Sequence, residues 1–259
     1  MAIITLTTDL GHKDFYQAAL KGSILSQLVT ANIVDISHEV SAFNIPQAAF
    51  ILKNAFYYFP KGTVHLIGID SVFNEKTRYL AIKYRGHYFV GSDNGIFSLL
   101  FEEEPTEIVE LNIMQDLKYL HFPLSDIFPK AVSHLAKGGK LSEIGIAVSG
   151  IEEKMTIQPV IEPDIIRGSV IYIDSFQNII TNITKELFTN VQQNRDFTLF
   201  FKRNESISQL SWHYNEVPEG EKLCLFGISN HLEIAINKGN ASGLLGLHLG
   251  DIVRIEFKS

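Results

Sequence analysis

The sequence predicts an α/β N-terminal domain, in which a mainly parallel sheet is flanked by helices, and a smaller, mostly-β, barrel-like C-terminal domain. As far as about residue 152, short β-branched runs alternate with segments of helical spacing. Beyond that point the apolar runs are almost all strand-like. A further pattern is that apolar runs repeatedly end on an aspartate, at Asp9, Asp35, Asp70, Asp93 and Asp174.

The position of these aspartates points to a function. Ligands of open α/β sheets bind just outside the carboxyl ends of the strands. A carboxylate at the end of a core strand is costly to bury unless another group pairs with it. A single aspartate there is usually a helix cap, but five of them predict a polar, cation-seeking site and therefore an enzyme.

The N-terminal elements follow one another in alternation. After the first strand, the spacing of apolar residues predicts a helix from Asp14 to Val29, with Asp14 placed as its cap. A helix from Asn44 to about Tyr58 carries Pro46 in its first turn, where proline is tolerated. The other expected elements are strands at 33–36, 64–70, 78–84, 88–90 and 107–111, and helices at 96–101 and 126–137, the last capped by Asp126.

The C-terminal part begins after an irregular stretch that contains Pro159 and Pro163. We therefore predict an α/β domain over 1–152, a linker over 153–165 and a barrel-like domain over 166–259. The expected strands are 168–174, 197–201, 222–226, 231–236 and 251–257, with one helix at 185–193.

Composition narrows the class of protein. A net charge of −7 and a pI near 5.7, without a local Lys/Arg cluster, argue against a nucleic-acid surface. Cys224 is alone in an apolar stretch, which excludes an internal disulfide and disfavours a zinc site. The start of the sequence lacks a basic region, and no uncharged apolar run approaches the ~18 residues that span a bilayer. We expect a cytoplasmic protein with no membrane partner.

Two loops of the N-terminal part carry candidate chemistry. Asp9 can accept two hydrogen bonds from a vicinal diol such as ribose, and Gly11 lets the backbone turn close to a ligand. Asp14 could hold an ammonium group, or it could simply cap the following helix. Asp70 with Arg78 could orient a water molecule; the alternative is an exposed hairpin pair worth about 0–1 kcal/mol. For Asp93, at the start of an Asp-Asn-Gly turn, structural capping is the stronger interpretation.

The C-terminal part offers groups that suit a nucleobase. The loop that follows the strand ending at Asp174 supplies an acid, an aromatic ring at Phe176, and amides that include Asn178. Amides suit base edges and aromatic faces suit stacking. The backbone of the segment Leu232–Ala241 could bind a purine edge, although most such segments are architecture.

Taken in order, these segments resemble one family, the S-adenosylmethionine (SAM) hydroxide adenosyltransferases, relatives of the fluorinases and chlorinases. The matching stretches are Thr8-Asp9-Leu10-Gly11 with Asp14 and Lys21-Gly22, Val34 to Val40, Phe59 to Val64, Ser92-Asp93-Asn94-Gly95, Asp174 to Asn182, and Leu232 to Ala241. They span almost the whole chain. The resemblance implies a homotrimer that binds SAM between neighbouring subunits.

By position, the resemblance also implies roles for individual residues. Asp9 would hold the ribose diol, and Asp14, Tyr16 and Asp174 would surround the methionine amine. The other implied contacts are Phe43 beside the ribose, Asn178 on adenine, Phe176 and Tyr214 as stacking partners, the backbone near Asn237 and Lys238 in the adenine slot, and Ser229 at the methionine carboxylate. Water would attack C5′ in line and methionine would leave as a neutral thioether. No metal or redox cofactor is implied, with SAM as the substrate.

The chain departs from the pattern at the water-activating positions. Asp70 matches the expected aspartate, but the expected arginine is Thr77, with Arg78 one place further on, and the expected histidine is Pro123. The usual Asp-Pro-Gly-Val-Gly turn has become Asp70 to Asn74, and His121 lies two residues before Pro123. A halogenase fits no better, because a carboxylate at position 70 would repel halide.

The sequence therefore favours a SAM hydrolase that uses Asp70 and Arg78. The alternative is a non-catalytic or repurposed SAM- or adenosine-binding protein. A calcium-dependent nucleoside hydrolase is a more distant idea, because Thr7 and Lys13 stand where extra acids would be expected.

Overall fold

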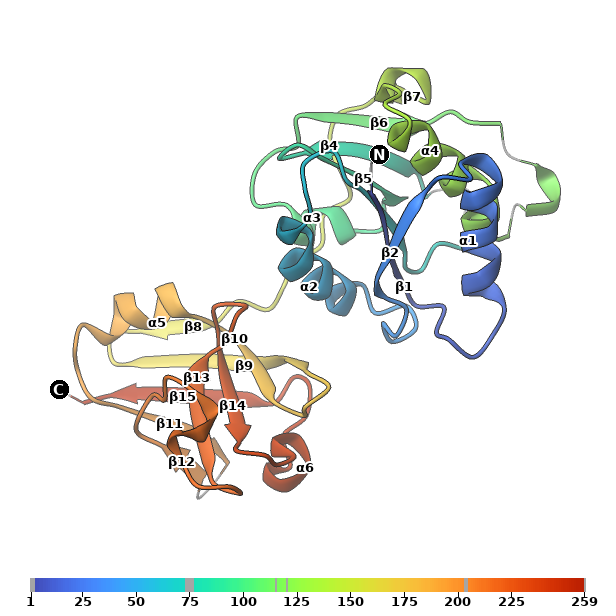
Figure 1. Cartoon of the computed structure of the whole chain (residues 1–259). Coiled ribbons are helices and arrows are strands. Elements are labelled where there is room, and N and C mark those ends of the chain that lie inside the picture. Colours follow the sequence, from blue (N-terminus) through green and yellow to red (C-terminus); the bar gives the residue numbers. More distant parts are fainter. Residues whose placement is uncertain (1–2, 73–76, 115, 120, 203–204, 259) are drawn as a thin grey trace. The chain divides into compact units, whose positions relative to one another are not determined.

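A computed structural model describes residues 3–72, 77–114, 116–119, 121–202 and 205–258. The chain forms two compact units, residues 1–156 and 157–259, each with its own core (Figure 1). Throughout the described ranges, no helix has the length and apolar character needed to cross a membrane.

The N-terminal unit is built on a seven-stranded sheet in the order β2-β1-β3-β5-β4-β6-β7. Its strands are β1 (Ile3–Thr8), β2 (Asn32–Ser37), β3 (Val64–Gly68), β4 (Tyr79–Tyr84), β5 (His87–Ser92), β6 (Glu107–Leu111) and β7 (Gly145–Ala147). The pairs β1–β2, β1–β3 and β3–β5 are parallel, whereas β4–β5, β4–β6 and β6–β7 are antiparallel. The sheet is thus mixed rather than mainly parallel, because β4 and β5 form a hairpin through Arg85 and Gly86, both at positive φ.

Helices cover both faces of this sheet. They are α1 (Tyr16–Gln27), α2 (Ile45–Ala55), α3 (Ile96–Leu100) and α4 (Ile127–Ala136), with short 3-10 turns at Phe56–Tyr58, Leu117–Tyr119, Pro123–Ser125 and Leu141–Glu143. Helices α1 and α4 share one apolar core with β1 and β3, and α2 and α3 share a second core with β4 and β5. Burial on both faces explains why the strands are continuous apolar runs rather than alternating ones.

Helix starts show where local sequence rules hold. The Asn44 side chain accepts a hydrogen bond from the Gln47 backbone N–H at 3.1 Å, with Pro46 in the first turn, as predicted. Helix α1 differs: it begins at Tyr16 after Phe15, and no side chain caps it. Asp14 is exposed and lies one residue before the N-cap position, which Phe15 occupies, so the prediction that Asp14 caps the helix is wrong.

The C-terminal unit is an eight-stranded sheet with the strand path β12-β11-β15-β9-β10-β14-β13, and β8 pairs with β9. The elements are β8 (Val160–Glu162), β9 (Ile165–Ile173), β10 (Ile179–Thr184), β11 (Phe197–Lys202), β12 (Glu205–Ile207), β13 (Lys222–Phe226), β14 (His231–Ile236), β15 (Ile252–Phe257), α5 (Lys185–Gln192), α6 (Ala241–Leu245) and the turn η5 (Tyr214–Glu216). Lys222 of β13 pairs with Glu205 of β12, so the sheet nearly closes into a barrel around an apolar core that includes the buried Cys224. Strand β8 lies within the segment expected to be a linker.

Candidate active site

The N-terminal unit carries a candidate region at the carboxyl ends of β1 and β3. The chain runs from β1 to β2 on one side of β1 and then from β2 to β3 on its other side, and ligands of α/β sheets bind at such a switch point. Asp9 follows β1, and its Oδ2 accepts the backbone N–H groups of Phe43 at 2.9 Å and Asp70 at 3.4 Å. The structure thus brings Asp9, Phe43 and Asp70 together from three separate segments.

Two of these residues have unusual backbones. Phe43 and Asp70 lie at φ 63° and 45°, in the left-handed region that bulky side chains rarely adopt. Such conformations cost about 1–3 kcal/mol each and cluster at functional sites. The Asp9 carboxylate offsets that cost by accepting both N–H groups, and both contacts use Oδ2, so Oδ1 is not committed to them.

A buried histidine fixes the turn that carries Asp9. Nδ1 of His38 lies 2.6 Å from Thr8 Oγ1, which also accepts the Leu10 N–H at 3.3 Å, and the His38 carbonyl accepts the Gly11 N–H at 2.7 Å. Nε2 of His38 makes no well-aligned hydrogen bond, but it lies 3.1 Å from Asp35 Oδ1. Burial lowers the pKa of His38, and the Asp35 carboxylate opposes that shift. The neutral ring therefore holds the turn by its side chain and its backbone.

The described hydrogen bonds of Arg78 are to Asp93 and Gly150. Its Nη2 donates to Asp93 Oδ2 at 2.5 Å and to the Gly150 carbonyl at 3.4 Å, while Asp93 Oδ1 accepts the Glu152 N–H at 2.8 Å. Asp93 is buried, so the Asp93–Arg78 pair ties the β4–β5 hairpin to residues 150–152. Asp93 does not cap α3, contrary to the sequence interpretation, because that position belongs to Gly95 at φ 93°.

The surroundings of Asp70 are only partly described. Its side chain is exposed, and Asn94 Nδ2 donates to the carbonyls of Ile69 at 3.0 Å and Asp70 at 3.5 Å. These bonds fix the backbone from which the carboxylate projects. Residues 73–76 of the following loop lie outside the described residues.

Asp14 and Tyr16 lie at the start of α1. Asp14 is exposed, and the Tyr16 ring packs 4.4 Å from Phe15 and 5.5 Å from Phe122, measured between ring centroids. Asp126 stands before α4, but its carboxylate accepts the Asp116 N–H at 2.9 Å and pairs with Lys130 at 2.6 Å instead of capping the helix.

The C-terminal unit carries a candidate region of its own, in the loop between β9 and β10. Asp174 Oδ1 accepts the Asn178 N–H at 2.8 Å and Oδ2 accepts Asn178 Nδ2 at 3.0 Å. This loop places Gln177 at φ 67° and leaves Phe176 79% exposed. The structure therefore joins Asp174 to Asn178 and presents an aromatic ring beside them.

Tyr214 is anchored by a residue that sequence reasoning missed. Its hydroxyl donates to Oε2 of Glu233 at 2.9 Å, and Glu233 is only 6% exposed. Burial raises the pKa of Glu233, the Tyr214 hydrogen bond opposes that shift, and burial also raises the pKa of Tyr214. The available signal was a lone glutamate inside the apolar run Leu232–Ile236.

Three further candidates have contacts of their own within the C-terminal unit. Ser229 lies in the turn before β14, where its carbonyl is 2.8 Å from His231 Nδ1. Asn237 is buried, and its backbone N–H and C=O are already bonded to Glu221 and Gly220. Lys238 is exposed at φ 53° and pairs with Glu219. The Asn237 N–H is thus used within the protein, whereas its carbonyl oxygen accepts one hydrogen bond there and has a second lone pair.

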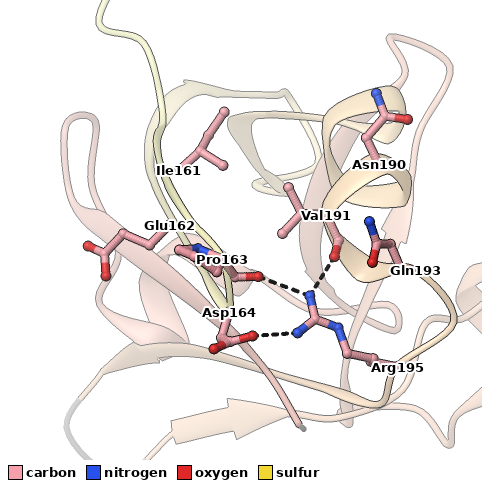
Figure 2. Close-up of a pocket in the computed structure, with 8 residues that line it drawn as sticks. All are labelled: Ile161, Glu162, Pro163, Asp164, Asn190, Val191, Gln193 and Arg195. Atoms are coloured by element: carbon pink, nitrogen blue, oxygen red, sulfur yellow. Dashed lines mark hydrogen bonds and ion pairs between the residues drawn. The ribbon is translucent and has the colours of Figure 1, made fainter.

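A hollow between β8 and α5 contains none of the predicted site residues (Figure 2). Arg195 lines it but is consumed by contacts to Asp164 Oδ1 at 2.5 Å, the Pro163 carbonyl at 3.0 Å and the Val191 carbonyl at 2.7 Å. Among the residues that the structure describes, no group of three or more His, Cys, Asp or Glu side chains is placed to hold a metal ion.

Comparison with known proteins shows the family of the chain. Residues 4–145 match the model of the SAM hydroxide adenosyltransferase N-terminal domain, and residues 168–254 match that of the C-terminal domain. The chain belongs to the SAM hydroxide adenosyltransferase family. It is 32% identical to the (R)-S-adenosyl-L-methionine hydrolase of Methanocaldococcus jannaschii, over 98% of this chain and 96% of the relative.

Two further proteins are similar to the chain over nearly its whole length. The (R)-S-adenosyl-L-methionine hydrolase of Thermus thermophilus is 27% identical, over 98% of this chain and all of the relative. The crystal structure of an uncharacterized conserved protein from Thermotoga maritima superposes with a TM-score of 0.88 at 30% identity, over 98% of this chain and 99% of that one. The chain is thus similar to these proteins along its whole length.

Proposed function

We propose that this protein hydrolyses S-adenosyl-L-methionine to adenosine and methionine. Its similarity to two (R)-S-adenosyl-L-methionine hydrolases over nearly their full lengths supports this, and the same names favour the (R) sulfonium epimer as substrate. The structural observation that carries the proposal is the meeting of Asp9, Phe43 and Asp70 at the β1–β3 switch point. Its contacts hold the backbones of Phe43 and Asp70 against the Asp9 carboxylate, and we propose that the side chains of all three residues meet the same ligand.

In the proposed reaction, a water oxygen attacks C5′ of the ribose as the C5′–S bond breaks. The bonding pair goes to sulfur, which leaves as a neutral thioether, and the attacking water loses one proton to solvent. The sulfonium is already an excellent leaving group, so the protein contributes alignment and orientation of the water. SAM is the substrate, and the residues assigned here need no metal or other cofactor.

We assign the ribose diol to Oδ1 of Asp9, which neither of its two described backbone contacts uses, with Phe43 beside the ribose. Asp70 orients the water as a hydrogen-bond acceptor. We propose Arg78 as a positioning residue, because its bond to Asp93 fixes the strand that begins one residue later. The remaining assignments are Asp14, Tyr16 and Asp174 at the methionine amine, Ser229 at its carboxylate, and Phe176, Asn178, Tyr214, Asn237 and Lys238 at adenine.

A specific observation favours a second candidate, a protein that binds SAM or adenosine without turning it over. Thr77 and Pro123 occupy the positions of the family's arginine and histidine, and the neighbouring Arg78 is bonded to the buried Asp93. If Asp70 alone cannot orient water, binding survives while hydrolysis does not.

The test is to incubate the pure protein with each sulfonium epimer and to follow adenosine by chromatography. Hydrolysis predicts adenosine above the spontaneous rate, with Asp70→Asn reducing it strongly and the exposed control Asp196→Asn leaving it unchanged. Tight SAM binding by calorimetry without adenosine would support the second candidate, and neither binding nor turnover would reject both.

We also propose a homotrimer with sites shared between neighbouring subunits, which light scattering of the full chain tests. A cytoplasmic location and the absence of nucleic-acid and membrane partners stay predictions of the sequence.

A further inference from the structure

Glu233 has no counterpart among the proposed substrate contacts, yet it is an unusual residue. It lies in the middle of β14, paired with Ile180 of β10 on one side and Leu225 of β13 on the other. Its neighbours in the small apolar cluster on β13 and β14 are Leu223, Leu225 and Ala235. A carboxylate that is 6% exposed beside such a cluster is costly to bury unless it is paired or hydrogen-bonded.

The described contacts of Glu233 leave it without a cationic partner. In the part of the chain that the structure describes, its side chain makes no ion pair, and its hydrogen bond is the one from Tyr214 at 2.9 Å. Burial raises the pKa of Glu233, the hydrogen bond from Tyr214 opposes that shift, and the nearby Asp174 raises the pKa further. The carboxyl group is therefore committed to the tyrosine hydroxyl rather than to a structural salt bridge.

Gly227 makes room for this carboxyl group. A Cβ at position 227 would lie 1.7 Å from Glu233 Oε1 and 2.3 Å from Cδ, which no real contact allows. A glycine before the turn into β14 thus allows the glutamate to lie where it meets the tyrosine. Gly227 leaves the space that the Glu233 carboxyl group occupies, and Glu233 accepts the hydrogen bond from the Tyr214 hydroxyl.

The hydroxyl is the point that fixes the tyrosine ring. Tyr214 opens the three-residue turn η5, remains 40% exposed, and follows Trp212, which is 89% exposed. The turn is tied to the sheet through the Ser211 N–H, which donates to the Cys224 carbonyl at 2.8 Å. The Ser211 bond and the Tyr214 hydroxyl bond thus tie this short segment to β13 and β14 at two points, while Tyr214 stays partly exposed.

We infer that Glu233 is a positioning residue: it holds the Tyr214 hydroxyl, with Gly227 as its cradle, and so orients the ring that stacks on the adenine. This rests on the proposed function, since the ring's ligand is the adenosyl group. Glu233 itself touches no reacting atom. Its loss therefore weakens binding of the adenosyl group and leaves the chemical step alone.

The test measures KM and kcat for SAM, and the dissociation constant for adenosine by calorimetry, in Glu233→Ala, Glu233→Gln, Tyr214→Phe and Gly227→Ala. We expect Glu233→Ala to raise KM for SAM and the dissociation constant for adenosine about 10-fold, since base stacking on an aromatic ring is a large part of such binding. The kcat value should stay within about 2-fold of the wild-type value. Gln retains an acceptor oxygen and restores near wild-type values. Gly227→Ala displaces the carboxyl group and resembles Glu233→Ala.

Tyr214→Phe keeps the inference testable if Glu233→Ala does not fold. It is expected to weaken adenosine binding, and the Glu233→Ala/Tyr214→Phe pair to be no worse than the worse single variant, as for one shared interaction. The exposed Tyr58→Phe is the matched control for loss of a hydroxyl. Wild-type adenosine affinity in both single variants overturns the inference, as does Glu233→Gln being as weak as Glu233→Ala. A wild-type protein that binds adenosine without hydrolysing SAM rejects the proposed hydrolase only.

Discussion

Acidification is expected to destabilise this protein through one buried histidine, His65. It lies on β3 with no exposed surface, Nδ1 2.7 Å from Thr5 Oγ1 and Nε2 3.2 Å from His87 Nδ1, and its ring is stacked 4.8 Å from Phe89. Burial, with a smaller contribution from His87, lowers the pKa of His65 to about 3. The folded protein therefore keeps this ring neutral at pH values where the unfolded chain protonates it.

The sign and size follow from linkage. Because the folded-state pKa is below the ordinary value of 6.5, the stability from neutral His65 is intact above pH 6.5, is lost as pH falls toward 3, and changes no further below that. One pH unit in this window corresponds to about 1.4 kcal/mol per proton. Between pH 7 and pH 5 the loss from this residue is therefore about 2 kcal/mol.

The assay is urea unfolding followed by far-ultraviolet circular dichroism at several pH values between 4 and 8, for the wild type and His65→Gln. The variant is expected to be less stable at pH 7, because Thr5 and His87 lose their partner. Its unfolding free energy should, however, decrease less steeply as the pH is lowered, with a slope that corresponds to about one bound proton fewer. His248→Gln, an exposed histidine, is the control. Equal slopes for wild type and His65→Gln would refute the reasoning.

Three other substitutions test the site. Asp9→Ala removes two hydrogen bonds to a carboxylate, each worth about 1.5–3 kcal/mol, and should lower kcat/KM for SAM by roughly 100-fold, with Asp9→Asn between it and wild type. Arg78→Ala leaves the buried Asp93 unpaired and should destabilise the protein by about 2–3 kcal/mol in urea unfolding, while adding Asp93→Asn recovers part of the loss. Thr8→Val removes the partner of His38, so it should raise KM for SAM and also lower the unfolding free energy by about 1–3 kcal/mol, because the buried His38 Nδ1 loses its hydrogen bond; an unchanged KM contradicts a role of that contact in the site.

The sequence predicted most elements because their signals are local. Asn44 followed by a proline in the next turn specifies the start of α2 without any tertiary contact. The parallel character of the sheet was overestimated, since a hairpin turn at Arg85 and Gly86 competes with the alternation of strands and helices that indicates crossovers. Asp14 failed as a cap because a cap depends on the residue at which the helix begins, and helix boundaries are the least determined part of a sequence pattern.

The candidate site residues likewise differ in whether local sequence signals or tertiary contacts determine their arrangement. Asp9 and Asp70 could be expected together, because both end strands that the topology places side by side. The engagement of Arg78 with Asp93 could not, since it depends on the register of the β4–β5 hairpin and on residues 150–152 returning to it. The role of Glu233 could not be predicted, because its segment has the pattern of an ordinary strand and its hydrogen-bond partner, Tyr214, is brought to it only by the fold.

Asp9 connects the conformation of the loops to the chemistry proposed for them. Phe43 and Asp70 adopt backbone conformations that oppose folding, and one carboxylate oxygen holds both N–H groups. A neutral amide at position 9 can still accept through its oxygen, but it lacks the charge that strengthens both bonds. The geometry of the aromatic ring and of the water-orienting carboxylate thus depends on the same ionised group that is proposed to bind the ribose, so loss of the Asp9 charge should impair binding and turnover together.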